Sequence, residues 1–480
     1  MRPARGPSPA GGLSFDGMAV ALLFIVVAFA ACLTVAQSDT YWSLRAGQDL
    51  WRTHHVPLVD TYSYTAAGQP WPNHEWLWQA VAYPLYRAGG FPLLTAAAAA
   101  ALVAAVALLW RTMVGAVPTR FLLVLLTIPL SSIEWTLRPQ IVTLLGLAGL
   151  LWLLVRDREA WLPPLFLVWA NVHGGVALGG AVLAAAALAA ALRARGAAAS
   201  PDDRRRAQRL RVALPLCALA TCATPLGFGI FRFVLGSESR LRAAHVSEWM
   251  PFSFGSVITA AFAALAAAFL VLLVVRWRRL REGTWGDWVA VAAVLVLAPF
   301  AARSARHVGA WLLLAPVAAS RLLGPDFRLR RAPRPASPDH PALNALLVGV
   351  VGVAALASVA RLWTLPLPRL GWRPLSDGAL TAVRACQDPL YNHYNDGGYL
   401  VWLAPEHKVF VDNRQDPYPL PLLLEHGEVE AGRRPPGPLL ARWGARCAFL
   451  PATSPTVAAL RAAGWRTTFR DRDWSVQVSP

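Results

Sequence analysis

The sequence predicts a polytopic α-helical membrane protein that carries a small α/β domain at its C-terminal end. Hydrophobic residues make up 56% of the 480 residues and charged residues only 15%, against roughly 25% charged residues in a typical soluble protein. Long apolar runs fill the chain up to residue 360, and a polar segment occupies residues 361–480. These observations disfavour a soluble globular enzyme.

The first predicted element is an apolar run over residues 17–37, which follows Arg2 and Arg5. About 20 apolar residues are enough to cross a bilayer. The run exceeds the roughly 7–15-residue apolar core of a cleavable signal peptide and lacks an A-x-A cleavage site, so we interpret it as a retained membrane anchor.

Further apolar runs bring the prediction to about eleven spans. They cover residues 92–110, 121–134, 139–155, 161–172, 174–192, 212–235, 255–275, 287–302, 307–322 and 343–360. The span count between residues 119 and 193 stays open, because Pro163, Pro164 and the Asn171 to Gly175 break also fit broken or re-entrant helices.

Arginine distribution predicts the orientation of these spans. With the N-terminus inside, 22 of the 44 arginines lie in the N-terminal tail and in cytoplasmic loops, against 9 in external loops. These cytoplasmic loops are 111–120, 156–160, 193–211, 276–287 and 321–342. The bias follows the positive-inside rule. The net charge of +18 is thus mainly a topology signal, and we expect no nucleic-acid partner.

The external loop 38–91 contains three carboxylates that are candidate catalytic residues: Asp39, Asp60 and Glu75. Asp39 stands at the outer end of the first span, where a carboxylate must face water, a cavity or a partner. Paired carboxylates can serve as a general base and as an orienting or metal-binding group. For Asp60, capping of the following turn is the structural alternative.

The same loop is rich in aromatic residues, among them Trp42. An interfacial aromatic belt explains most of them. The functional alternative is a platform that stacks on sugar rings or holds an isoprenoid chain. Trp42 and His74, which both belong to this loop, are candidates for contacts with an acceptor or with the C-terminal domain.

Residues 361–480 are predicted to fold separately from the membrane domain 1–360. The pattern favours strands at 399–403 and 408–411 joined by a hairpin-like connection, a helix at 457–463 and a last strand at 476–478. Asp412 and Arg414 are candidates for binding an acceptor sugar or for docking this domain onto the membrane domain. Cys386 and Cys447 can pair if this segment lies in an oxidising compartment.

Cations at the external face are candidate ligands for a phosphate. They are Arg138, Arg303, Arg306 and His173. Arginine suits phosphate because its fork donates two parallel hydrogen bonds. Snorkelling at a helix end is the alternative for Arg303 and Arg306, and an interhelical hydrogen bond is the alternative for His173.

Several of these segments resemble membrane glycosyltransferases of the GT-C class, in particular a bacterial branch related to protein mannosyltransferase-like and lipid A arabinose transferase-like enzymes. The resemblance rests on Asp39 to Trp42, Val56 to Tyr64, Trp71 to Leu77, Trp169 to Gly175, Gly397 to Leu400 and Val409 to Arg414.

This resemblance implies a GT-C-like fold and a transfer from a polyprenyl-phosphate sugar to a periplasmic or lipid-linked acceptor, which would be a glycan, a lipid or a protein. Asp39 takes the place of the acidic residue after the first span, which implies a role as base or acceptor-orienting carboxylate. The implied location is the bacterial inner membrane, with a cytoplasmic N-terminus and a periplasmic C-terminal domain.

Two other functions stay open. A transporter or flippase for an envelope lipid or glycan would use the same charged residues along a path, although inverted repeats with charges at the membrane midplane are not evident. A non-catalytic relative would act in envelope assembly. The sequence has no metal-binding motif, so a divalent cation is neither required nor excluded, and no phosphate-binding, dinucleotide or serine-hydrolase motif is present.

Overall fold

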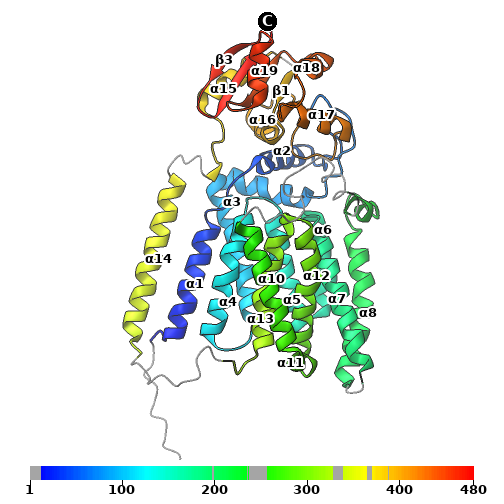
Figure 1. The fold of residues 1–480 in the computed structure, drawn as a ribbon, viewed down its shortest axis with the longest axis vertical. Helices are drawn as coiled ribbons and strands as arrows, with labels where there is room; N and C mark the ends of the chain where they lie inside the picture. The colour runs from blue at the N-terminus through cyan, green and yellow to red at the C-terminus, as the bar shows by residue number, and fades with distance from the viewer. Residues whose placement is uncertain are drawn as a thin grey trace, which may run out of the picture.

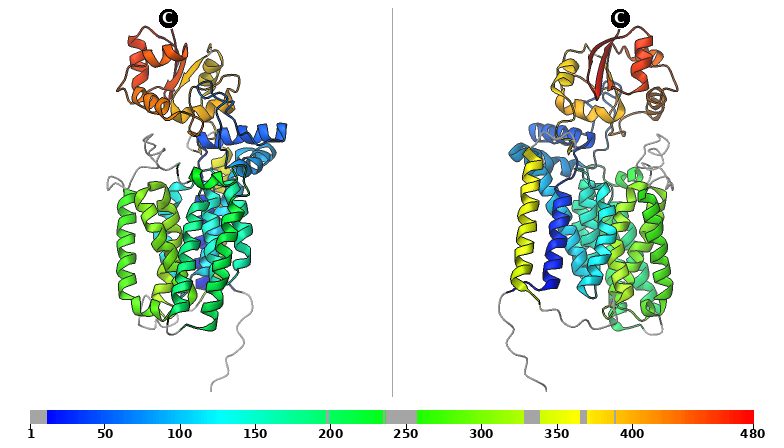
Figure 2. Two further views of the ribbon diagram at one scale, coloured as in Figure 1. Left: turned by 90° about the vertical axis from the view of Figure 1, so that its right-hand side faces the viewer. Right: turned by 60° about the vertical axis from the view of Figure 1, so that its left-hand side comes forward.

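The computed structural model describes residues 12–196, 199–234, 236, 257–327, 339–364, 370–387 and 389–480. A bundle of apolar helices forms the lower part of the molecule in Figure 1, and the C-terminal domain stands above one end of it. Two further helical segments lie across the top of the bundle, between the two parts (Figures 1 and 2). The chain therefore has a membrane-type part and a polar part, as its composition predicts.

Each predicted apolar run overlaps a helix, but the run 212–235 is not one continuous span, because its helix ends at Thr221 and residues 222–228 are not helical. The helices are α1 (Phe15–Ala31), α3 (Trp76–Thr112), α4 (Val117–Ser131), α5 (Gln140–Val155), α6 (Leu162–Val172), α7 (Val176–Arg195), α8 (Pro201–Thr221), α10 (Val257–Val275), α12 (Trp285–Arg303), α13 (Val308–Leu323) and α14 (Pro341–Thr364). Four of those described, α3, α7, α12 and α14, are both long and apolar enough to cross a membrane on their own. Part of the predicted run 212–235 and the start of the run 255–275 lie outside the described residues.

The predicted cytoplasmic loop 193–211 is largely helical. The helix α8 begins at Pro201, where Ser200 and Asp203 form a capping box, so the arginine-rich stretch is the first half of a helix. Ion pairs hold this half in place: Arg193 with Asp203 at 3.0 Å and Arg206 with Asp157 at 2.6 Å. Capping and ion pairing outweigh the polar composition that suggested a loop.

The predicted external loop 38–91 contains two helical segments. The helix α2 (Ser38–Thr53) buries one face and leaves the other polar, and it packs against α3. The helix α3 bends at Gly89 and Gly90, and Gly90 has a φ of +63° that favours glycine. The bend separates a segment that lies across the bundle from the apolar segment that enters it.

The C-terminal domain contains a four-stranded sheet in the order β1-β2-β4-β3. Its strands are β1 (Leu390–Asn392), β2 (Cys447–Pro451), β3 (Arg466–Arg470) and β4 (Trp474–Val478). The first two strands pair in parallel and the other pairs are antiparallel. The helices around the sheet are α15 (Asp377–Arg384), α16 (Gly397–Leu403), α17 (Leu420–Glu430), α18 (Gly437–Trp443) and α19 (Pro455–Ala462).

Two predictions for this domain are wrong and two are confirmed. Residues 399–403 belong to the helix α16, and residues 408–411 form no strand beyond an isolated bridge between Val409 and Ser63. A short apolar run is ambiguous by periodicity alone, and here the Gly397 and Gly398 pair starts a helix. The predicted helix 457–463 and strand 476–478 correspond to α19 and β4.

Cys386 and Cys447 form a disulfide with a Cα–Cα distance of 5.8 Å. It joins the segment that follows α15 to the first residue of β2, across 61 residues of sequence. The pairing that the sequence left open is thus made in the structure. A cross-link over a loop of this length stabilises a fold by about 2–4 kcal/mol.

Candidate functional site

A cavity of about 590 Å³ lies where the helix bundle, the segments above it and the C-terminal domain meet. Predicted site residues from all three parts line it: Asp39, Trp42, His74, Glu75, Arg138, His173, Arg306 and Arg414. Apolar residues such as Leu144, Leu178 and Phe300 line it from the bundle. The folding therefore brings together residues that are up to several hundred positions apart in the sequence.

Asp39 lies in the first turn of α2, and three side chains donate hydrogen bonds to its carboxylate. Arg138 forms an ion pair with Oδ2 at 2.5 Å, the indole of Trp42 donates to Oδ1 at 3.2 Å, and the amide of Asn413 also donates to Oδ1. A helix N-terminus adds a favourable dipole for an anion. The carboxylate that the sequence singled out is thus held in one orientation at the edge of the cavity.

The start of α2 is fixed against the segment that carries Arg138. The hydroxyl of Thr40 donates to the carbonyl of Leu137 at 2.8 Å, and Val35 bridges to Thr136. Arg138 also donates to the side chain of Gln37 at 3.1 Å. These contacts explain why two residues 99 positions apart in sequence form the ion pair.

Glu75 precedes the first residue of α3 and points into the same cavity. The pKa of Glu75 is raised to about 8, chiefly by burial and also by the nearby charge of Asp39, whereas Arg306 and Arg138 act in the opposite direction. Burial lowers the pKa of the adjacent His74 to about 4. The 3.6 Å contact between His74 and Glu75 is therefore a contact between neutral groups near pH 7.

His173 occupies the break between α6 and α7. Its Nδ1 forms a hydrogen bond with the hydroxyl of Thr143 at 2.7 Å, and its Nε2 lies 3.2 Å from the guanidinium of Arg306. A Cβ at Gly175 would lie 2.3 Å from the Thr143 hydroxyl oxygen, which explains why glycine follows in this break.

Arg303 is the one predicted phosphate ligand that does not line the cavity. It is exposed at the last residue of α12, whereas Arg306 lies one turn further on and faces the cavity. Snorkelling at the helix end accounts for Arg303. The structure thus separates two arginines that the sequence could not distinguish.

The overall arrangement of the chain matches a solved structure. That structure is ArnT from Cupriavidus metallidurans in the apo state, with a TM-score of 0.52, 15% sequence identity and alignment over 96% of this chain and 98% of that one. The sequence matches no protein-family model and no curated protein. The likeness shows a GT-C-like fold for this chain.

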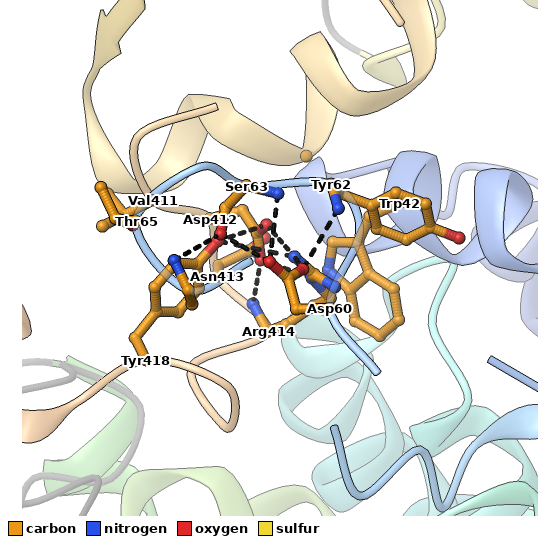
Figure 3. A network of polar contacts seen from close by, with 12 residues as sticks. Trp42, Asp60, Tyr62, Ser63, Thr65, Val411, Asp412, Asn413, Arg414 and Tyr418 are labelled. Atoms are coloured by element: carbon orange, nitrogen blue, oxygen red, sulfur yellow. Dashed lines mark hydrogen bonds and ion pairs between the residues drawn. The ribbon is translucent and has the colours of Figure 1, made fainter. Parts of the chain in front are cut away.

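Asp60 and Arg414 form a buried ion pair that joins the segment between α2 and α3 to the C-terminal domain (Figure 3). The guanidinium of Arg414 lies 2.5 Å from Asp60 and 2.7 Å from Asp412, and the hydroxyl of Tyr418 donates to Asp412 at 2.8 Å. The rings of Tyr62 and Trp71 each lie 4.8 Å from the guanidinium carbon. This arrangement fits the docking alternative for Asp412 and Arg414.

Asp60 does not line the cavity. Its carboxylate accepts the backbone amides of Tyr62 and Ser63 at 3.3 and 3.2 Å and the Ser63 hydroxyl at 2.6 Å. These contacts are those of a turn-capping residue, which was the structural alternative for this position. Asp60 therefore fixes a turn and the docked domain from behind Arg414, which does line the cavity.

Sequence reasoning missed several polar residues of the cavity: Gln37, Glu134, Gln140, Tyr394 and Asn413. Glu134 accepts a hydrogen bond from the backbone amide of Gly309, at the N-terminal end of α13, at 3.1 Å. A carboxylate at the end of an apolar run was a usable signal for Glu134. Asn413 lies between two residues that were singled out, so only its immediate neighbours pointed to it.

The described residues contain no group of three His, Cys, Asp or Glu side chains placed to hold a metal ion. What the cavity does present is carboxylates and cations side by side, next to an apolar wall. It can accept a hydroxyl proton, donate hydrogen bonds to a carbonyl or phosphate oxygen, and contact an apolar chain.

Proposed function

We propose that this chain is a membrane glycosyltransferase that moves a sugar from a polyprenyl-phosphate donor to an acceptor hydroxyl at the external face of the bacterial inner membrane. The acceptor is a glycan, a lipid or a protein. The observation that carries the proposal is the convergence of Asp39, Glu75, Arg138 and Arg306 on one cavity next to apolar helices. The GT-C-like fold supports it.

The two ends of a lipid-linked donor match different walls of the cavity. A phosphate fits beside Arg306 and Arg138, which both line the cavity, because arginine donates paired hydrogen bonds to phosphate oxygens. An isoprenoid chain fits along Leu144, Leu178 and Phe300, which line the cavity from the bundle. The sugar would then lie between the phosphate and the carboxylates above it.

Asp39 and Glu75 suit different tasks. In the proposed step the acceptor oxygen attacks the anomeric carbon, the bond from that carbon to the phosphate oxygen breaks, and polyprenyl phosphate leaves. Asp39 orients the acceptor hydroxyl and receives its proton. Glu75, with its raised pKa, is mostly protonated near pH 7 and donates a hydrogen bond to the substrate. Carboxylates with separated pKa values commonly divide such roles.

The test is sugar transfer by membranes that contain the full chain and a set of labelled polyprenyl-phosphate sugars. Asp39→Asn is expected to lower the rate by about 100- to 10,000-fold, the usual contribution of a general base, while expression and membrane insertion stay unchanged. Asp377→Asn is the matched control, because Asp377 is exposed at the start of α15 and outside the cavity.

Two outcomes would contradict the proposal in different ways. Full activity in Asp39→Asn would remove this carboxylate from the mechanism. No release of polyprenyl phosphate from any donor by the wild-type chain, together with movement of the intact lipid across the bilayer, would instead favour a flippase.

A further inference from the structure

The side chain of Asn413, in the C-terminal domain, contacts the proposed catalytic carboxylate directly. Its amide nitrogen donates to Oδ1 of Asp39, and its amide oxygen accepts from the hydroxyl of Ser38 at 3.2 Å. Both contacts cross more than 370 positions of sequence. A residue of the last quarter of the chain thus helps to hold the group at the start of α2.

The hydrogen bonds around Asn413 have a fixed direction. The backbone amide of Gly398 donates to the Ser38 oxygen at 3.0 Å, which leaves the Ser38 hydroxyl proton for the oxygen of Asn413. An ionised Asp39 carboxylate can only accept, so the amide nitrogen of Asn413 must face it. The series therefore runs from a backbone amide in α16, through Ser38 and Asn413, to Asp39.

The neighbours of Asn413 on both sides are locked. Asp412 accepts from the backbone amide and the side chain of Arg414 at 3.0 and 2.8 Å, and Arg414 is paired with Asp60. Figure 3 shows Asn413 beside this network. Because Asp412 and Arg414 are fixed, Asn413 has little freedom to turn away from Asp39.

We propose that Asn413 is a positioning residue for Asp39, so that the docked C-terminal domain contributes to the active centre by orienting this carboxylate. This role rests on the proposed transferase function. Asn413 occupies one lone pair of Oδ1 and, together with Arg138 and Trp42, holds the carboxylate in one orientation at the wall of the cavity. Positioning of this kind raises the rate of the chemical step without binding the donor.

The first test is Asn413→Ala in the full chain, assayed for transfer from a labelled polyprenyl-phosphate sugar. A hydrogen bond to a charged group is lost, so kcat is expected to fall about 10- to 100-fold, while KM for the donor stays unchanged. Gln387→Ala is the control, because it removes an exposed amide of the same domain outside the cavity. Unchanged kcat in Asn413→Ala, with an active wild type, overturns the positioning role and leaves the proposed function standing.

The second variant, Asn413→Asp, keeps the size of the side chain and places a like charge next to Asp39. The titratable and charged groups that line the cavity with Asp39 come from every part packed around it: Glu75, Glu134, Arg138, Arg306, Arg414, Asp416, His74, His173, His307, Tyr394 and Tyr399. Because these stay the same, the acidic limb of the profile of kcat/KM against pH is expected to move to higher pH. An unmoved limb contradicts the inference.

A third measurement does not depend on transfer. The melting temperatures of Asp39→Ala, Asn413→Ala and the double variant form a cycle, and a direct contact predicts that the two single losses do not add. Additive losses overturn the contact and therefore the inference. A wild-type chain that transfers no sugar overturns the positioning role together with the proposed function. Non-additive losses of melting temperature would in that case still show the contact between Asp39 and Asn413.

Discussion

At the scale of single residues, the carboxylates of the first external segment proved to differ in ways that their types did not reveal. Asp39 and Glu75 line the cavity, whereas Asp60 is fully enclosed in a turn and paired with Arg414. The sequence placed all three in one segment, and it offered capping as the alternative for Asp60. The sequence could not decide between catalysis and capping for Asp60, because the partner of Asp60 lies 354 positions away.

The pKa of Glu75 leads to a prediction for the dependence of activity on pH. Burial raises this pKa to about 8, so the side chain holds its proton near neutral pH and loses it as the pH rises through about 8. If the protonated form donates to the substrate, the transfer rate falls above that pH. Glu75→Gln, which always donates, should keep most of the activity near pH 7 and should lack this fall.

The measurement is kcat/KM from about pH 6 to pH 10 for the wild type, Glu75→Gln and Glu75→Ala. The alanine variant should be impaired throughout, because it cannot donate at any pH. A fall with the same midpoint in Glu75→Gln as in the wild type would assign the titration to another group and would remove this role from Glu75.

At the scale of elements, the apolar runs predicted the bundle helices well, because a continuous apolar run of helical length has few other solutions in a membrane. The polar stretches were harder. Residues 38–53 and 201–211 are polar enough to suggest loops, yet capping residues and tertiary contacts make them helical. The run at 399–403 suggested a strand, since five apolar residues carry no decisive period.

The glycine pair that opens α16 has a packing reason that predicts an outcome for substitution. A Cβ at Gly398 would lie 2.3 Å from the carbonyl oxygen of Ser38, and one at Gly397 would lie 2.1 Å from the carbonyl oxygen of Val411. Backbone atoms cannot move aside as a flexible side chain can. The close approach of α16 to the start of α2 therefore depends on Gly398, and its close approach to Val411 depends on Gly397.

Gly398→Ala is expected to lower the free energy of unfolding by roughly 1–3 kcal/mol, the usual cost of overpacking, and to lower transfer by displacing Ser38. Gly427→Ala is the control, because Gly427 lies inside α17 with no atom within 4 Å of the added Cβ. There the same change should stabilise by about 0.4–1 kcal/mol. Thermal unfolding measures the change in stability of both variants, and equal changes in Gly398→Ala and Gly427→Ala would contradict the packing argument.

At the scale of the whole molecule, the sequence predicted a membrane part and a polar part but not how closely they are joined. The motifs Asp39 to Trp42, Val56 to Tyr64, Gly397 to Leu400 and Val409 to Arg414 meet at one place, between the bundle and the C-terminal domain. Contacts over such sequence distances leave no local periodicity, so only the resemblance of the separate segments to one family linked them in advance.

The fold also allows a test of the predicted orientation in the membrane, because the cavity and the arginine-rich segments lie at opposite ends of the bundle (Figure 1). The C-terminal domain and the cavity lie at one end of the bundle, and the described arginines of α8 and of the short helix α11 (Trp277–Arg281) lie at the other (Figure 1). The positive-inside rule assigns the arginine-rich end to the cytoplasm. We therefore expect the cavity and the disulfide-bonded domain to face the periplasm, which is an oxidising compartment.

A reporter enzyme that is active only in the periplasm, fused after Pro480, is therefore expected to be active, whereas the same reporter fused after Leu323, at the arginine-rich end of α13, is expected to be inactive. Labelling of thiols with and without a reductant in whole cells should show Cys386 and Cys447 oxidised in the full chain. The opposite reporter pattern would invert the topology. It would place the cavity in the cytoplasm, where the disulfide would be reduced and the proposed periplasmic acceptor could not reach Asp39.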